Sequence, residues 1–333
     1  MQAIRIHPSK TSAAFSPSNP APSSALVLDS DIAIPSPRPG HILVRVHAAT
    51  VTRDELSWPE SYTEEFHIPG YDFAGVVADV HETDASAFQP GDEVFAFSDI
   101  EKGSAWAEYT TVAVKNVALK PKTLSFEEAA TVPMCALTAW QALFVHSGLQ
   151  EPDLTGNISP PNGRSVLITG ASGAVGCYLV QLAAAAGLHV VAASSSNERN
   201  GDFLRSLGAS EAVEYDEIIR IGRTFETIVD TVGGDPLSKS WAFVTDGGSI
   251  VTVDSSSFDF SNAAAPSGKE HVKKLFFILK PSGEQLRMVS KALDAGLLRT
   301  FVAHTFPLPE AKAAYEKASG RLDRRGKVVL TIP

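Results

Sequence analysis

The chain has 333 residues, of which 44 % are hydrophobic and 20 % are charged, so about two soluble globular domains are expected. A net charge of −10 with no basic block argues against a nucleic acid or an anionic membrane as partner. Two cysteines, Cys135 and Cys177, are too few for a disulfide framework or a four-cysteine zinc site, and they indicate reduced thiols.

The beginning of the chain permits two interpretations. Residues 1–28 contain no acidic side chain and several serines, as in a mitochondrial transit peptide. Residues 3–7 instead alternate in polarity, which predicts the first strand of a mature domain. No apolar run reaches the ~20 residues of a membrane span. We therefore expect a cytoplasmic protein, with a mitochondrial location as the lesser alternative.

The first 125 residues are predicted to be rich in β-strands. Apolar, β-branched runs predict strands at 41–51 and 73–80, and a Pro-Gly turn at 90–91 leads into a third strand that ends at 97. The Ser/Pro-rich segment 16–24 predicts a solvated loop.

Helical spacing begins at Ser125. Ser125 and Glu128 have the spacing of a capping box, which predicts a helix over 125–144, followed by a loop at 149–164. Beyond the loop, helical patterns separate predicted strands at 165–169, 189–193, 227–232 and 249–253. This alternation predicts βαβ units and a doubly wound parallel sheet.

The tail of the chain is predicted to return to the first domain. Helices at about 284–296 and 309–319 precede a last strand at 326–332. We therefore expect residues 1–125 and 271–333 to build one β-rich domain from both chain ends, and residues 126–270 to build the doubly wound domain.

A glycine-rich turn lies in the segment LITGASGAVGCYLVQLA, residues 167–183. Residues 171–176 give the dinucleotide fingerprint G-x-G-x-x-G with alanine in place of its first glycine. Gly173 would let the backbone approach a pyrophosphate, and Gly176 would let the next helix pack close to the sheet. One stripe of that helix is predicted to face the core: Val175, Tyr178, Leu179, Leu182, Ala183 and Ala186.

The end of the second strand of the doubly wound domain indicates which dinucleotide binds. An NAD site usually carries an acid there, whereas this chain has Ser194, Ser195 and Ser196. These hydroxyls and the guanidinium of Arg199 suit a 2′-phosphate, with Glu198 as the one residue of opposite charge. The sequence thus predicts NADP(H) as the cofactor.

The whole chain resembles the medium-chain dehydrogenase/reductase superfamily, in its zinc-independent quinone oxidoreductase and enoyl reductase branch. The resemblance runs in the family's order from residue 41 to the C-terminus through HILVRVHAATVT, IPGYDFAGVVADV, QPGDEVFAF, EEAATVPMCALTAWQAL, VLITGASGAVG, FLRSLGASEAVEY, IVDTVGG, GEQLRMVSKALDAG and GKVVL. Short-chain dehydrogenases are excluded because no tyrosine is followed by lysine four residues later.

The resemblance implies a GroES-like domain around a Rossmann domain. It also implies a 2′-phosphate role for the serine cluster, Arg199 and Tyr215, and a position on the nicotinamide side for Thr138. The expected cofactor-binding residues are Thr138, Ser172, Gly173, Ala174, Val175, Gly176, Ser194, Ser195, Ser196, Arg199, Tyr215 and Val232.

The resemblance also predicts that no metal is bound. Metal-dependent relatives have a zinc-binding cysteine where this chain has Thr52, and Gly-His-Glu where it reads Gly70-Tyr71-Asp72. A catalytic Zn²⁺ needs about three N, S or O ligands, and the positions that would supply them have changed.

Without a strong Lewis acid, hydride addition to a quinone or to the C=C of an α,β-unsaturated carbonyl is the favoured chemistry, because the developing charge spreads to an oxygen that a hydroxyl can stabilise. Candidate donors are Thr52, Tyr71 and Tyr62, although a buried tyrosine such as Tyr71 is as often a packed core residue. We therefore expect an NADPH-dependent reductase.

Two other functions are compatible with the sequence. An accessory enoyl reductase acting on a carrier-tethered polyketide would share these motifs, as would a non-catalytic NADPH-binding protein. The expected partner is a small molecule, with no nucleic acid and no membrane, and the protein is expected to be a monomer or a homodimer.

Overall fold

The fold is described from a computed structural model that covers residues 1–9, 13–81, 87–98, 103–154 and 159–333. The chain divides into two compact units. Unit 1 comprises Met1–Met134, Pro281–Ser290 and Arg299–Pro333, and unit 2 comprises Cys135–Lys280 and Lys291–Leu298. Both chain ends thus contribute to unit 1, and the first crossing lies at 134/135 because α1 (Phe126–Ala130) packs on the sheet of unit 1.

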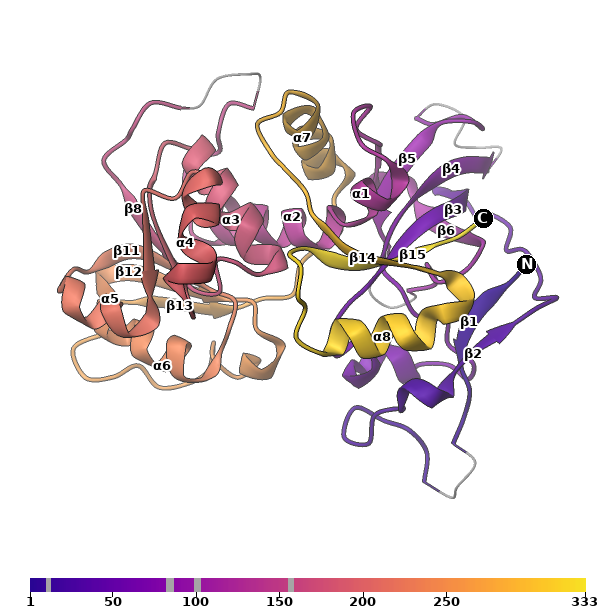
Figure 1. Cartoon of the computed structure of the whole chain (residues 1–333), viewed down its shortest axis with the longest axis horizontal. Helices are drawn as coiled ribbons and strands as arrows, with labels where there is room; N and C mark the ends of the chain where they lie inside the picture. Colours follow the sequence, from indigo (N-terminus) through magenta and orange to yellow (C-terminus); the bar gives the residue numbers. More distant parts are fainter. Residues whose placement is uncertain (10–12, 82–86, 99–102, 155–158) are drawn as a thin grey trace. The chain divides into compact units, whose positions relative to one another are not determined.

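Unit 1 is built mainly of β-strands. Its strands are β1 (Ala3–Ile6), β2 (Leu26–Asp29), β3 (His41–Val51), β4 (Asp72–Val80), β5 (Glu93–Phe97), β6 (Tyr109–Ala113), β7 (Val117–Leu119), β14 (Val302–Pro307) and β15 (Lys327–Thr331). A seven-stranded sheet has the order β14-β15-β3-β4-β5-β7, with β6 paired to β3, while β1 and β2 form a separate pair. Figure 1 shows the yellow C-terminal strands running among the indigo and purple N-terminal ones.

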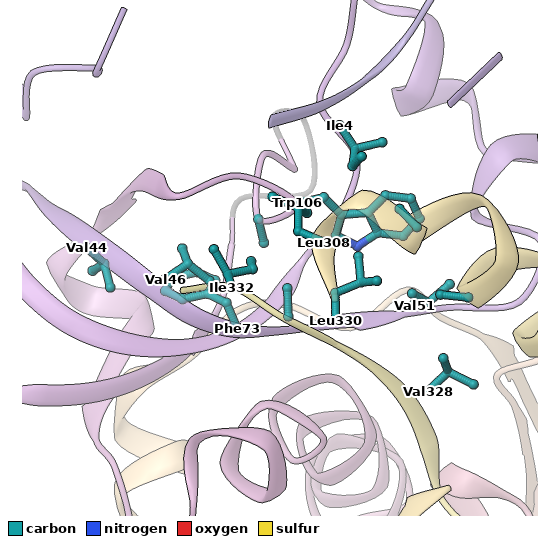
Figure 2. Packing of buried hydrophobic residues seen from close by; sticks show 14 of the residues in the cluster. Ile4, Val44, Val46, Val51, Phe73, Trp106, Leu308, Val328, Leu330 and Ile332 are labelled. Atoms are coloured by element: carbon teal, nitrogen blue, oxygen red, sulfur yellow. The ribbon is translucent and has the colours of Figure 1, made fainter. Parts of the chain in front are cut away.

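The core of unit 1 joins side chains from both ends of the chain. Figure 2 shows Ile4, Phe73 and Trp106 gathered with Leu330 and Ile332, and all five are buried. Because β15 lies inside the sheet, between β14 and β3, its apolar side chains are needed to complete this core.

Unit 2 contains a six-stranded parallel sheet of order β10-β9-β8-β11-β12-β13. Its strands are β8 (Ser165–Ile168), β9 (His189–Ser194), β10 (Glu211–Glu214), β11 (Phe225–Asp230), β12 (Val244–Thr252) and β13 (Lys273–Phe276). In chain order this is 3-2-1-4-5-6, the strand order of the dinucleotide-binding doubly wound fold. The predicted α/β class and parallel sheet are confirmed.

Eight α-helices are described, and none of the described helices is long and apolar enough to cross a membrane. They are α1 (Phe126–Ala130), α2 (Pro133–Trp140), α3 (Ala174–Ala185), α4 (Asn197–Ser206), α5 (Tyr215–Ile221), α6 (Gly234–Phe243), α7 (Gly283–Asp294) and α8 (Ala311–Ser319).

The helix predicted over 125–144 is interrupted. The capping box forms as expected, since Ser125 Oγ accepts from Glu128 N at 3.2 Å and Glu128 Oε2 accepts from Ser125 N at 2.9 Å. The helix stops before Pro133 because proline disfavours helical backbone in the residue that precedes it. After α2 the chain continues as a π-helix, Gln141–His146.

Candidate functional site

The glycine-rich turn connects β8 to α3. Gly170 has a φ of +65°, and Gly173 is the residue that precedes the first turn of α3. Among the described residues no side chain caps this helix, and Gly173 is exposed, so a ligand could bind the amide groups at the start of the helix. Such amides, at the positive end of the helix dipole, form a site for a phosphate.

Gly176 is required by the close approach of α3 to the turn. A Cβ atom there would lie 2.2 Å from the carbonyl oxygen of Gly170 and 2.7 Å from Cα of Ala171. At Gly173, a Cβ atom would meet only the Gly170 oxygen, at 3.2 Å. Gly176 therefore fits the helix-packing position, and Gly173 fits a position where backbone faces a ligand.

The turn lies where the strand order of the sheet reverses. β8 is flanked by β9 on one side and by β11 on the other, and ligands of doubly wound sheets bind at the carboxyl ends of such strands. Val232, which follows β11, is 40 % exposed, and Ser172, Ala174 and Val175 of the turn are half-buried. The predicted stripe on α3 is wrong in one respect: nearly the whole helix is buried, not one face.

The three serines after β9 have different surroundings. Ser194 is buried; its Oγ accepts from Nδ2 of Asn200 at 3.1 Å and donates to the Ser196 carbonyl at 3.4 Å. Ser195 is exposed, and its Oγ accepts from the Arg199 guanidinium at 3.3 Å. Ser196 caps α4, with Oγ accepting from the Arg199 amide at 3.5 Å. Of the predicted phosphate donors, Ser195 and Arg199 are exposed and in contact with each other, whereas Ser194 is bonded inside the protein.

Two carboxylates lie beside this cluster. The amide of Asn197 donates to Oε1 of Glu214 at 2.7 Å, and its side-chain amide donates to Oε2 of Glu217 at 3.1 Å. Both acids also form the capping box of α5. Their negative charges would repel a bound phosphate. The hydrogen bonds that they accept from backbone and side-chain amides reduce this repulsion.

Tyr215 and Thr138 complete the predicted cofactor residues. Tyr215 OH accepts from the amide of Gly170 at 3.1 Å, and burial raises the pKa of this phenol. The contact joins the start of α5 to the glycine-rich turn. Thr138 lies on α2 and is buried.

Unit 1 contains a buried group of charged and polar side chains around Asp72. The Lys327 ammonium forms an ion pair with Oδ2 of Asp72, which also accepts from Thr50 Oγ1 at 2.8 Å. Oδ1 accepts from the amide of Met134 at 2.7 Å. Both charged side chains are almost fully buried, at 7 % exposed for the lysine and 0 % for the aspartate.

Thr52 lies beside this ion pair. Its Oγ1 accepts from Nζ of Lys327 at 3.3 Å, and its own hydrogen points to the Met134 sulfur at 3.8 Å. A thioether is a weak acceptor, so a carbonyl oxygen would compete for this hydrogen successfully. Thr52 is partly exposed, whereas Tyr71 is buried.

Glu55 is the second buried carboxyl of unit 1. Its Oε1 accepts from the amide of Gly70 at 2.5 Å, and its Oε2 accepts from the amide of Thr52 at 3.3 Å. Burial raises the pKa of Glu55 to about 7, and these two backbone bonds oppose the rise.

The two candidate tyrosines are placed in the protein interior. Tyr71 is 2 % exposed, and its ring stacks on Phe97 with centroids 5.7 Å apart. Its hydroxyl is buried without a hydrogen-bond partner among the described residues, and burial raises its pKa. The hydroxyl of Tyr62 donates to the Leu56 carbonyl and accepts from the amide of Ala21 at 2.8 Å. The Tyr62 hydroxyl is thus occupied by backbone groups, and the Tyr71 hydroxyl is enclosed by the protein.

Comparison with known proteins gives the family. Residues 38–122 match the model "Alcohol dehydrogenase GroES-like domain", and residues 207–330 match "Zinc-binding dehydrogenase". The chain is 36 % identical over 313 residues to a "Probable zinc-binding oxidoreductase, mitochondrial" of Arthroderma benhamiae, covering 90 % of this chain and 91 % of that one. The chain belongs to the medium-chain dehydrogenase/reductase superfamily.

Two further relatives agree with this membership. A mitochondrial NAD(P)H oxidoreductase of Mus musculus is 29 % identical over 88 % of this chain and 82 % of its own. The structure of a quinone oxidoreductase from Coxiella burnetii superposes with a TM-score of 0.82 at 26 % identity, covering 100 % of this chain and 99 % of that one. This medium-chain protein is therefore an oxidoreductase of the quinone oxidoreductase branch, and its cofactor is a nicotinamide nucleotide. The predicted family and GroES-like plus Rossmann architecture are confirmed.

The donor set of this medium-chain protein does not fit zinc, although relatives are named for that metal. Thr52 and Tyr71 offer hydroxyls, and both oxygens of Asp72 are already bonded. The Lys327 ammonium, in contact with Thr52 and Asp72, would repel a cation. No group of three His, Cys, Asp or Glu able to hold a metal ion occurs within the described ranges.

Sequence reasoning did not identify Lys327 or Glu55 as members of the site. Lys327 was noticed only as part of the motif GKVVL, and Glu55 lies three residues after Thr52. The signal for Lys327 is register: Val328 pairs with Val51 in antiparallel strands, so the next pair along is Lys327 and Thr52.

Proposed function

We propose that this protein is an NADPH-dependent, zinc-independent reductase that transfers a hydride to a quinone or to the C=C of an α,β-unsaturated carbonyl. One observation carries the proposal: Thr52 holds a partly exposed hydroxyl whose oxygen accepts from an ammonium and whose hydrogen, among the described residues, meets only a thioether. This is a donor for an oxygen that becomes negative during reaction, and it needs no metal.

Reduction of a conjugated acceptor requires no stronger hydrogen-bond donor than the Thr52 hydroxyl. A simple alcohol–carbonyl interconversion places full charge on one alkoxide oxygen and is usually assisted by a Lewis acid. In a conjugated acceptor the charge spreads over an enolate or hydroquinone, for which one polarised hydroxyl is adequate. The similarity to a quinone oxidoreductase supports the same substrate class.

The glycine-rich turn would hold the cofactor, which supplies the hydride when bound. The open amides of the first turn of α3 would bind its pyrophosphate, with Gly173 facing it. Ser195, Ser196 and Arg199 would bind a 2′-phosphate, which supports NADPH over NADH despite the nearby carboxylates. Val232 and Thr138 remain proposed cofactor contacts.

The proposal is tested by NADPH oxidation against a panel of quinones, enals, cyclic enones and acyl-thioesters. We expect turnover with quinones or enones, a loss of about tenfold or more in kcat for Thr52→Val, and retention by Thr52→Ser, the matched control that keeps a hydroxyl. Activity on thioesters alone would favour the carrier-dependent enoyl reductase. NADPH binding without any turnover would favour the non-catalytic alternative and contradict the proposal.

The cellular compartment and the oligomeric state of the protein also remain to be tested. A cytoplasmic location was expected, but the two sequence relatives described above carry "mitochondrial" in their names, which favours the alternative. Imaging of the tagged full-length gene product decides between them, and sedimentation decides between monomer and homodimer.

A further inference from the structure

The position of Lys327 is determined by the pairing of β15 with β3. The register Val328↔Val51 places this lysine opposite Thr52, at the point where β3 ends. Burial of a lysine is costly unless its ammonium is paired and hydrogen-bonded. Here Asp72 provides the pairing charge, and Thr52 Oγ1 and the Met134 sulfur receive further contacts of the same ammonium.

The oxygen and the hydrogen of the Thr52 hydroxyl have partners of very different strength. Its oxygen accepts from a cation at 3.3 Å, and its hydrogen lies against sulfur at 3.8 Å. A hydroxyl whose oxygen accepts from an ammonium is polarised and becomes a stronger donor, and low surrounding polarity increases the effect. Lys327 would thus affect a reacting oxygen through Thr52, without touching the substrate.

We propose that Lys327 is a positioning residue of the reduction, whose ammonium orients and polarises the Thr52 hydroxyl toward the carbonyl oxygen of the substrate. The proposal rests on the proposed function. A hydride, supplied by the bound nicotinamide, adds to the β-carbon; the π pair of the C=C bond forms the enolate double bond, and the π pair of the C=O bond moves onto the carbonyl oxygen. Thr52 stabilises this oxyanion while keeping its own proton, and water supplies the proton that completes the reduction.

The ion pair of Lys120 provides a matched control. Lys120 is a second buried lysine of unit 1, and its Nζ lies 3.2 Å from Oε2 of Glu93 and 3.1 Å from the Pro121 carbonyl. Lys120→Met therefore removes a buried ammonium from the same unit without touching Thr52. It should lower stability but leave kcat unchanged.

The decisive experiment is a double-mutant cycle between Lys327→Met and Thr52→Val, with kcat, KM and the NADPH dissociation constant measured for each variant. We expect Lys327→Met to lower kcat by about tenfold when Thr52 is present, and by less than about twofold in the Thr52→Val background. NADPH affinity should stay unchanged, and Lys327→Arg should recover most of the rate because it restores a cation.

A single lysine replacement leaves Asp72 buried and unpaired, so Lys327→Met can fail to fold. The double variant Asp72→Asn/Lys327→Met removes both charges together and should fold while still losing about tenfold in kcat. The role of Lys327 would be overturned if Lys327→Met lowered kcat equally with Thr52 present and in the Thr52→Val background. Full kcat in Asp72→Asn/Lys327→Met, or weakened NADPH binding, would overturn it as well. A wild type that reduces no acceptor would instead overturn the proposed function, and this proposal with it.

Discussion

Stability should depend on pH through the buried carboxyl of Glu55, and Glu55→Gln should remove that dependence. The Glu55 side chain is fully buried, and its pKa rises from 4.5 to about 7. Between these values the folded protein keeps a proton that the unfolded chain has released. The free energy of unfolding therefore falls as pH rises, at about 1.4 kcal/mol per pH unit. Across this window the loss is about 3 kcal/mol.

Glutamine is the appropriate replacement because it stays neutral at every pH. Its amide oxygen can still accept from the amide of Gly70, which Glu55 Oε1 now receives at 2.5 Å. When the unfolding free energy of the wild type is subtracted from that of the variant, the contributions of all other titrating groups cancel. We expect this difference to shift by about 3 kcal/mol in favour of the variant between pH 4.5 and pH 8.

Urea titrations at several pH values provide the measurement. The tryptophans of unit 2, Trp140 and Trp241, are replaced by phenylalanine, so that the fluorescence of Trp58 and Trp106 follows unit 1 alone. A difference that stays constant to within about 0.5 kcal/mol from pH 5 to pH 8 would show that Glu55 is ionised throughout this range. The inference that burial keeps Glu55 protonated above its ordinary pKa would then be wrong.

Five further outcomes are expected. Gly176→Ala should destabilise the protein by about 2 kcal/mol or more, because its Cβ would collide with backbone, and thermal unfolding measures this. Arg199→Ala should weaken NADPH binding about tenfold and spare NADH, and equal wild-type affinities for the two would refute the 2′-phosphate assignment. Tyr62→Phe should cost about 1–3 kcal/mol by leaving two backbone groups unpaired, whereas Tyr71→Phe should stabilise by about 1 kcal/mol by removing an unpaired hydroxyl, both without loss of kcat. Elemental analysis should find no stoichiometric zinc, and about one tightly held zinc per chain would contradict the reading of the donor set.

The central part of each sheet could be predicted from sequence, but its edges could not. The prediction of 41–51 coincides with β3, and the four inner strands of unit 2 were all located. The two edge strands, β10 and β13, were missed because they carry charged residues, Glu211 and Lys273 among them. Charged side chains on an edge strand protect its open side from pairing with another chain, and they also weaken the apolar periodicity that marks a strand.

The site was predictable where it depends on local backbone and unpredictable where it depends on distant side chains. The glycine-rich turn is local, and its structure agrees with the pattern. Lys327 and Asp72 are 255 positions apart, so only the strand register reveals their contact. The position of Ser194 at the end of a strand predicts a phosphate donor, but its hydrogen bond with Asn200, six residues later, could not be foreseen from the sequence. Residue type gives the available chemistry, and packing decides which groups can use it.

The interior position of β15 has a consequence for how the protein is made. The six strands of unit 2 lie between residues 165 and 276, so the ribosome delivers all of them well before Lys327–Thr331. Unit 2 can then fold as a nascent chain, whereas the sheet of unit 1 stays open at β3 until the last strand emerges. An exposed strand edge invites aggregation, so this interval is when the polypeptide most needs a chaperone. A chain that terminates before β15 should therefore retain dinucleotide affinity yet be cleared by proteolysis.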